Sequence, residues 1–106
     1  MGEEAEIQKR ILDWLKLQTG VKMWRSNAGQ RQSNVKLAPA GCPDIIGYVK
    51  EGKKKGRAIF IEVKAPGKKL SPVQVGWRNE LWNARCIWMC VSSLQTVIDY
   101  FNELGI

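Results

Sequence analysis

Histidine is absent from the 106 residues of this chain. Imidazole is the side chain that changes charge near neutral pH and the commonest protein ligand of transition metals. Its absence excludes a histidine base, a histidine nucleophile and a histidine-ligated metal. A hydrolytic reaction on this chain must therefore rely on carboxylates, lysine and a hard cation bound by oxygen atoms.

Cysteine is scarce, and long apolar runs are missing. Cys42, Cys86 and Cys90 are odd in number and show no CxxC spacing, which argues against a zinc site and a disulfide framework. No apolar stretch approaches the roughly 18 residues that span a bilayer, and the acidic start of the chain does not resemble a signal peptide. We therefore expect a reduced, intracellular protein.

Acidic residues are outnumbered, 10 against 17 lysines and arginines, which gives a net charge of +7. The excess is concentrated in two segments. Residues 22–36 carry four basic residues and no acid, and residues 50–69 carry eight basic residues against two acids. Such a basic excess on a small domain indicates a polyanionic partner, first of all nucleic acid. The alternative is that basic loops only keep the protein soluble.

Hydrophobic periodicity and turn residues predict one α/β domain over residues 1–106. Ser71 and Ser93 are expected to cap helices, with Pro72 in the first turn of the former. The expected order is helix 3–18, strand 21–25, strand 44–49, a lysine-rich hairpin turn, strand 57–64, a helix from Ser71, strand 86–91 and a helix from Ser93. We expect the first helix and the Ser71 helix to cover the sheet. Strand 86–91 should be parallel to its neighbour and, being apolar on both faces, interior.

Charged residues stand inside two of these apolar strands. In Ile59-Phe60-Ile61-Glu62-Val63-Lys64, Glu62 and Lys64 point to one face and their neighbours to the other. Asp44 opens the neighbouring strand. Charges buried in a sheet cost several kcal/mol unless they are paired or bind a metal, so this pattern indicates a chemical role. The alternatives are that Asp44 is a turn residue and that Glu62 and Lys64 pair with Arg57 or Lys50.

Together with Gln74 on the Ser71 helix and Glu6 on the first helix, these residues resemble the PD-(D/E)xK nuclease superfamily. The closer resemblance is to its VRR-NUC family, the virus-type replication and repair nucleases. It is carried by Gly41-Cys42-Pro43-Asp44-Ile45-Ile46-Gly47, by residues 61–74 from Ile61-Glu62-Val63-Lys64 to Ser71-Pro72-Val73-Gln74, and more loosely by residues 25–29. The resemblance implies a restriction-endonuclease-like αβββαβ core with a mixed central sheet flanked by helices.

The predicted site is a Mg²⁺ centre that also accepts Mn²⁺. Asp44, Glu62 and the backbone carbonyl of Val63 are the expected ligands, and Glu6 would reach the metal through water or hold a second ion. Lys64 would orient or deprotonate the attacking water, and Gln74 would hold that water or Lys64. The alternatives are a capping-box role for Gln74, three residues after Ser71, and a merely exposed Glu6.

The predicted substrate is DNA, cut as a branched structure by a structure-selective endonuclease. The resemblance favours a Holliday junction resolvase of the phage type that acts as a homodimer. The alternatives are a nuclease fold that only binds nucleic acid and an RNA-directed nuclease. Trp77, Trp82 and Trp88 are expected in the core or a dimer interface. The residues expected to contact nucleic acid are Lys22, Trp24, Arg25, Asn27, Arg31, Lys36, Lys53, Lys54, Lys55, Lys68 and Lys69.

Overall fold

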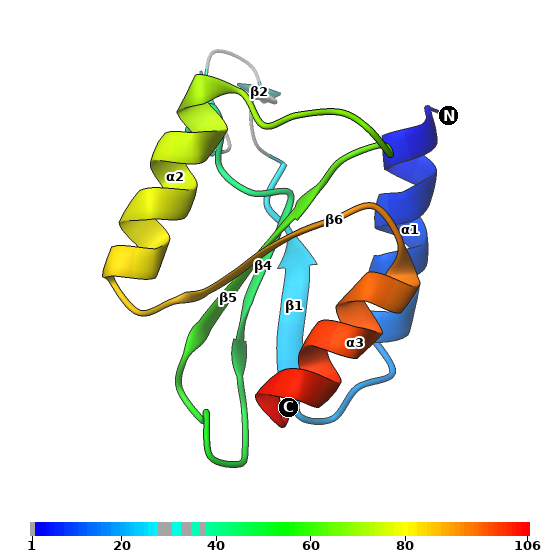
Figure 1. Ribbon diagram of the computed structural model, residues 1–106, viewed down its shortest axis with the longest axis vertical. Coiled ribbons are helices and arrows are strands. Elements are labelled where there is room, and N and C mark those ends of the chain that lie inside the picture. Colours follow the sequence, from blue (N-terminus) through cyan, green and yellow to red (C-terminus); the bar gives the residue numbers. More distant parts are fainter. Residues whose placement is uncertain (1, 28–30, 33–34, 37) are drawn as a thin grey trace.

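In the described residues, the fold places three helices around a four-stranded sheet, with a small two-stranded sheet beside it (Figure 1). The computed structural model describes residues 2–27, 31–32, 35–36 and 38–106. The elements are α1 (Glu3–Leu15), β1 (Val21–Arg25), β2 (Arg31–Gln32), β3 (Val35–Lys36), β4 (Ile45–Val49), β5 (Ala58–Val63), α2 (Pro72–Asn83), β6 (Ile87–Val91) and α3 (Leu94–Leu104).

The main sheet has the strand order β1-β4-β5-β6. β1, β4 and β5 pair antiparallel, and β6 pairs parallel to β5 after the crossover through α2. This arrangement confirms the predicted αβββαβ core and the parallel last strand. The expectation that β6 is interior was wrong, because β6 forms an edge of the sheet. It is apolar on both faces because α2 packs on one face and α3 on the other.

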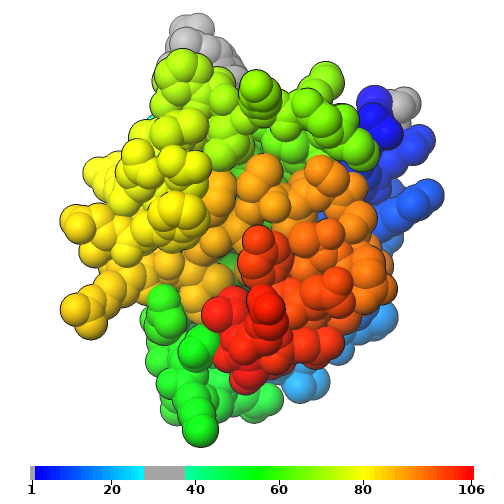
Figure 2. Space-filling model, viewed as in Figure 1, coloured from blue at the N-terminus to red at the C-terminus, as the bar shows by residue number. Residues whose placement is uncertain are grey.

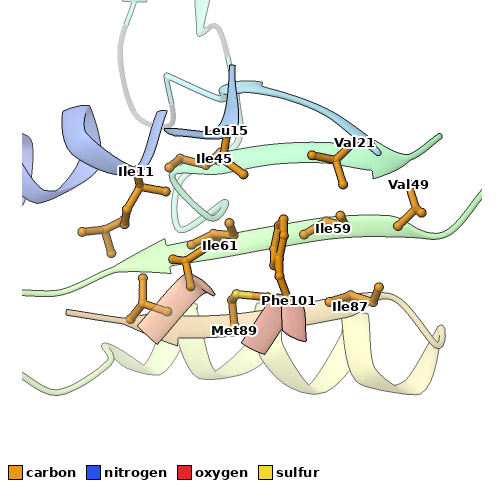
Figure 3. Packing of buried hydrophobic residues seen from close by; sticks show 13 residues of the cluster. Ile11, Leu15, Val21, Ile45, Val49, Ile59, Ile61, Ile87, Met89 and Phe101 are labelled. Carbon is orange, nitrogen blue, oxygen red and sulfur yellow. The ribbon is translucent and has the colours of Figure 1, made fainter. Parts of the chain in front are cut away.

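The core lies between the sheet and the α1/α3 pair (Figure 3). Ile59 and Ile61 of β5 are fully buried there against Ile11 of α1 and Phe101 of α3. The prediction that α1 and the Ser71 helix cover the sheet was therefore incomplete. α1 and α3 share one face, and α2 takes the other, as the ribbon view shows (Figure 1). In the space-filling view, α2 forms the left side of the molecule, and α3 and α1 lie to its right (Figure 2).

Serine caps set where the last two helices begin. The Ser71 side chain accepts a hydrogen bond from the Gln74 N–H, and the Ser93 side chain accepts one from the Thr96 N–H. Both caps confirm the sequence prediction. The first helix ends at Leu15, three residues before its predicted end. Within the described part of the chain, no helix is long and apolar enough to cross a membrane.

The apolar residues of α2 are only partly buried. Leu81 is 8% exposed, whereas Val73 is 54% exposed and Ala84 at the C-cap is also exposed. The reason is that α2 packs on β6 at the sheet edge and does not extend across the whole sheet face. The half of that face over β1 and β4 therefore stays accessible.

Candidate active site

Asp44 and Glu62 face each other across two paired strands. Ile45 of β4 lies opposite Ile61 of β5, so Asp44 lies opposite Glu62 one position further. Directly opposed side chains in an antiparallel pair have Cβ atoms about 4.5–5.5 Å apart. The prediction that two acids meet on neighbouring strands is confirmed by this register. Both side chains are on the face that α2 partly covers, at the carboxyl end of β5.

Pro43 ends the β4–β5 ladder at this point. The Val49 N–H donates to the Arg57 carbonyl at 2.9 Å, and hydrogen-bonded pairs recur at every second residue. Ile45 and Ile61 are therefore a hydrogen-bonded pair, and the next hydrogen-bonded position would join Pro43 to Val63. Proline has no N–H, so the Val63 carbonyl receives no ladder bond from β4 and is available as an oxygen ligand. The sequence Pro-Asp thus frees a carbonyl beside the carboxylate that follows it.

The Asp44 side chain replaces the missing strand pairing. Its Oδ2 accepts a hydrogen bond from the Val63 N–H at 2.8 Å. The Pro43 carbonyl, the usual partner of that N–H, instead accepts from the Ser26 Oγ at 2.6 Å. The Ser26 N–H donates to the Asp44 carbonyl at 2.8 Å. Ser26 thus fixes the backbone on both sides of the Pro43–Asp44 peptide bond. In the sequence, Ser26 was included only in residues 25–29, which match the resembled family loosely.

Gly41 brings this segment against α2. Its φ is 80°, in the left-handed region, and a Cβ there would collide with Cγ1 of Val73. The Trp77 Nε1–H donates to the Ala40 carbonyl at 3.1 Å. Only glycine fits both the backbone conformation and the close approach. The close packing of Gly41 on α2 therefore fixes where the segment before Asp44 lies relative to that helix.

Gly41→Ala is expected to lower the free energy of unfolding by about 2–4 kcal/mol, measured by urea denaturation, because strain and overpacking add. Gly67→Ala is the matched control. Gly67 has a φ of 83° but nothing within 4 Å of its would-be Cβ, so this variant carries the strain without the collision. A loss no larger than that of Gly67→Ala would show that contact with α2 does not position this segment.

Glu62 is a buried acid, with 3% of its surface exposed. Burial raises the pKa of Glu62 to about 9, a hydrogen bond with Asp44 and repulsion from its charge raise it as well, and Lys64 opposes the shift. In the metal-free protein the pair therefore holds a proton at neutral pH. An ion pair of Glu62 with Arg57 or Lys50 is ruled out. Arg57 donates to the Arg85 carbonyl, and the only ion pair among the described residues joins Lys9 to Asp13.

Glu4 is the α1 acid that the structure brings to the site. Its Oε2 accepts from the Ala65 N–H at 3.0 Å, and its charge helps to raise the pKa of Glu62. Glu6, which the sequence analysis favoured, is exposed on the same helix. Helical spacing could have separated the two. Glu4 precedes the buried Ile11 by seven residues and shares its face, whereas Glu6 precedes it by five and lies about 140° away.

Lys64 and Gln74 have different surroundings. Lys64 follows β5 directly, its N–H donates to the Val91 carbonyl at 2.9 Å, and its charge acts on Glu62. The Gln74 Oε1 accepts from the Ser71 N–H at 2.9 Å, which completes the capping box. The structure thus shows the alternative role of Gln74. Among the described contacts, none joins its side chain to the carboxylates.

The basic residues expected to contact nucleic acid are divided between the two ends of the sheet. Lys68 and Lys69 are exposed in the loop after β5, at the carboxylate end, and Arg25 ends β1 on the same side. Lys53, Lys54 and Lys55 lie in the β4–β5 hairpin at the opposite end (Figure 1). Arg57, at the hairpin end of β5, lies five positions before Glu62, which is about 17 Å along an extended strand.

The remaining residues of that set are on or near β1 and the small sheet. Lys22 and Trp24 are exposed on β1, and Asn27 is half-buried with a left-handed φ of 57°. Arg31 is on β2 and Lys36 on β3. The side chains of Arg31 and Lys36 lie outside the described residues.

The donor set fits a hard divalent cation. Asp44 and Glu62 supply two carboxylates, and Val63 supplies a carbonyl without a ladder bond. Because Asp44 and Glu62 together hold a proton at neutral pH, a bound cation would replace that proton and compensate the charge of both acids. In the described part of the chain, no three cysteine, aspartate or glutamate side chains are already assembled around a metal position. Glu4 is turned to the Ala65 N–H.

The αβββαβ core, with facing carboxylates and a lysine at its strand ends, defines a nuclease fold of the PD-(D/E)xK type. The VRR-NUC domain model matches residues 2–90, and the chain belongs to the VRR-NUC family. A solved structure described as a VRR_NUC domain is 19% identical, covers 97% of both chains and has a TM-score of 0.68. Another, described as a VRR_NUC domain protein, is 20% identical, covers 97% of this chain and 88% of its own, and has a TM-score of 0.64. No curated protein matches the chain.

Proposed function

We propose that this nuclease domain is a divalent-metal-dependent endonuclease that hydrolyses phosphodiester bonds in branched DNA. The observation that carries the proposal is the buried Glu62 opposite Asp44, beside the Val63 carbonyl freed by Pro43. A purely structural pair of acids would be destabilising at neutral pH. Asp44, Glu62 and Val63 would hold Mg²⁺ or Mn²⁺, which when bound supplies Lewis acidity at the phosphate and at water.

The chain's own residues have separable tasks in this reaction. Asp44 is held by the Val63 N–H and by the contacts of Ser26 with the neighbouring backbone, so the carboxylate oxygen that faces Glu62 keeps a fixed direction. Lys64 stands next to the carboxylates and neutralises charge on the phosphate or orients the attacking water. Glu4 fixes the Ala65 N–H and adds negative charge at the rim of the site.

Cleavage of matched substrates tests the proposal. Four-way junction, flap, nicked and linear duplex DNA of equal length are incubated with Mg²⁺, with Mn²⁺ and with EDTA. We expect cleavage of the junction that requires the metal, with symmetric incisions that indicate a resolvase of the phage type. Binding of junctions without cleavage would identify a non-catalytic nucleic-acid-binding module. Faster cleavage of a matched RNA would identify an RNA-directed nuclease.

A homodimer is part of the proposal, since two sites related by two-fold symmetry suit the paired incisions of a resolvase. Light scattering of the purified protein, alone and with junction DNA, measures its mass. We expect twice the mass of the 12.0 kDa chain. A monomer in both conditions, combined with single nicks, would restrict the enzyme to flap-like or nicked substrates.

The position of the basic residues leads to a matched pair of double variants. We expect Lys68→Ala/Lys69→Ala to weaken junction binding without metal by about threefold or more, because loss of phosphate contacts lowers affinity. Lys53→Ala/Lys55→Ala removes the same charge from the far hairpin and should have the smaller effect. Titration in EDTA at two salt concentrations measures both. Equal losses would indicate that DNA also contacts the hairpin end.

A further inference from the structure

An aromatic pair lies on the open half of the sheet face that carries the carboxylates. Trp24 of β1 is 45% exposed and Tyr48 of β4 is 41% exposed. Their ring centroids are 6.4 Å apart at an interplanar angle of 71°. Large aromatic side chains exposed side by side on a sheet lose apolar contact with the core, so they indicate a binding surface.

The strand register places this pair on the carboxylate face. Trp24, Ile46, Phe60 and Trp88 form one row across the four strands. Trp88 packs edge-to-face on Trp82 of α2, with centroids 5.5 Å apart, so the row faces the α2 side. α2 packs on β6 at the far end of this row. The β1 and β4 end, with Trp24 and Tyr48, is left accessible.

The charge around the pair favours a polyanion over an apolar protein surface. Lys22 lies directly opposite Tyr48 and is exposed, and Arg25 follows Trp24. The whole chain carries +7. Aromatic faces combined with basic side chains are the combination that binds single-stranded nucleic acid, through base stacking and phosphate contacts.

The pair is one to two nucleotides away from the carboxylates. Trp24 is opposite Ile46, two residues from Asp44 on β4. With about 4.8 Å between strands and about 6.7 Å between every second residue, the Trp24 and Asp44 Cα atoms are roughly 8 Å apart. Tyr48 lies a further two residues along β4. A strand that is bound at Glu62 and Asp44 and runs along β4 would pass over Trp24 and then Tyr48.

We propose that Trp24 and Tyr48 form a stacking platform for one or two unpaired bases next to the scissile phosphate. The inference rests on the proposed nuclease function and narrows its substrate. Bases in an intact duplex are already stacked and cannot reach the platform, so the preferred DNA has an unpaired or unstacked nucleotide at the cleavage position. Open junction centres and flap bases supply this feature, and continuous duplex does not.

Fluorescence anisotropy with a labelled oligo(dT) and a duplex of equal length, both in EDTA, tests the platform without cleavage. We expect Trp24→Ala and Tyr48→Ala each to weaken oligo(dT) binding about tenfold and duplex binding less than about threefold. Trp24→Phe should restore most of the oligo(dT) affinity. Trp82→Ala is the matched control, because Trp82 is 53% exposed and also in an edge-to-face pair, but sits on α2.

Equal losses on both nucleic acids, equal losses in Trp82→Ala, or no loss at all would overturn the platform. A Trp24→Ala protein that changes from dimer to monomer with unchanged oligo(dT) affinity would also overturn it, since the surface would then be a subunit interface. The proposed function is judged separately. If the wild-type protein cuts junctions and Trp24→Ala keeps its ratio of junction to duplex cleavage, the platform fails and the nuclease function stands.

Discussion

Glu62→Gln is expected to reduce metal-dependent DNA cleavage by at least about a hundredfold, and Lys64→Ala to reduce it similarly. Loss of a metal ligand or of charge stabilisation at the phosphate raises the barrier by several kcal/mol, and each 1.4 kcal/mol is a factor of ten. Glutamine keeps the shape of Glu62 and removes only its charge. Single-turnover cleavage of a junction measures the rate.

The controls separate lost chemistry from lost binding. Glu51→Gln removes a carboxylate from the exposed hairpin and should leave the rate unchanged. Both site variants should keep salt-sensitive binding to the junction, because phosphate contacts come from the surrounding basic residues. A Glu62→Gln or Lys64→Ala protein that retains more than a few per cent of the wild-type rate would remove these residues from the active site.

The metal-free protein is expected to lose stability as the pH rises, and Glu62→Gln is expected to abolish most of that loss. The pKa of Glu62 is raised from 4.5 to about 9 in the folded protein. Between these values the folded state binds more protons than the unfolded state, so the free energy of unfolding falls with increasing pH. The contribution of Glu62 to stability is thus fully present below pH 4.5 and is lost progressively up to about pH 9.

Urea denaturation in EDTA at pH 5 and pH 8 measures the effect. We expect the wild-type protein to lose about 4 kcal/mol more than Glu62→Gln over this range, because nearly three pH units at about 1.4 kcal/mol each lie between the two pKa values. Asp44→Asn should also raise metal-free stability at pH 8, because it removes the repulsion while its amide oxygen can still accept from the Val63 N–H. The same pH dependence in wild type and Glu62→Gln would contradict the burial of an ionisable pair.

Much of the fold was predictable from sequence because local signals agreed with the tertiary structure. The serine caps, the glycine-flanked hairpin and the apolar alternation of β5 each set an element where the structure has it. The edge position of β6 was not predictable. Apolar residues on both faces of a strand indicate that both faces are covered. They do not indicate whether strands pair with both of its edges.

The charged residues on the strands of the site could be predicted from sequence, because a charge inside an apolar strand is unusual in any fold. Glu4 was missed because three acids lie in the first turn of α1. Only their angular position relative to the buried residues of the helix distinguishes them. Ser26 was missed because its contacts with Pro43 and Asp44 join residues 17 and 18 positions away. The open face with Trp24 and Tyr48 depends on how far α2 extends across the sheet, which composition and periodicity do not specify.

The most direct test is a crystal structure with Mn²⁺, with the ion located from its anomalous signal. We expect a peak in direct coordination with a carboxylate oxygen of Asp44, a carboxylate oxygen of Glu62 and the Val63 carbonyl. This peak should be absent from Glu62→Gln crystals. A peak at another position, or Asp44 and Glu62 still hydrogen-bonded to each other at saturating Mn²⁺, would contradict the proposed metal site.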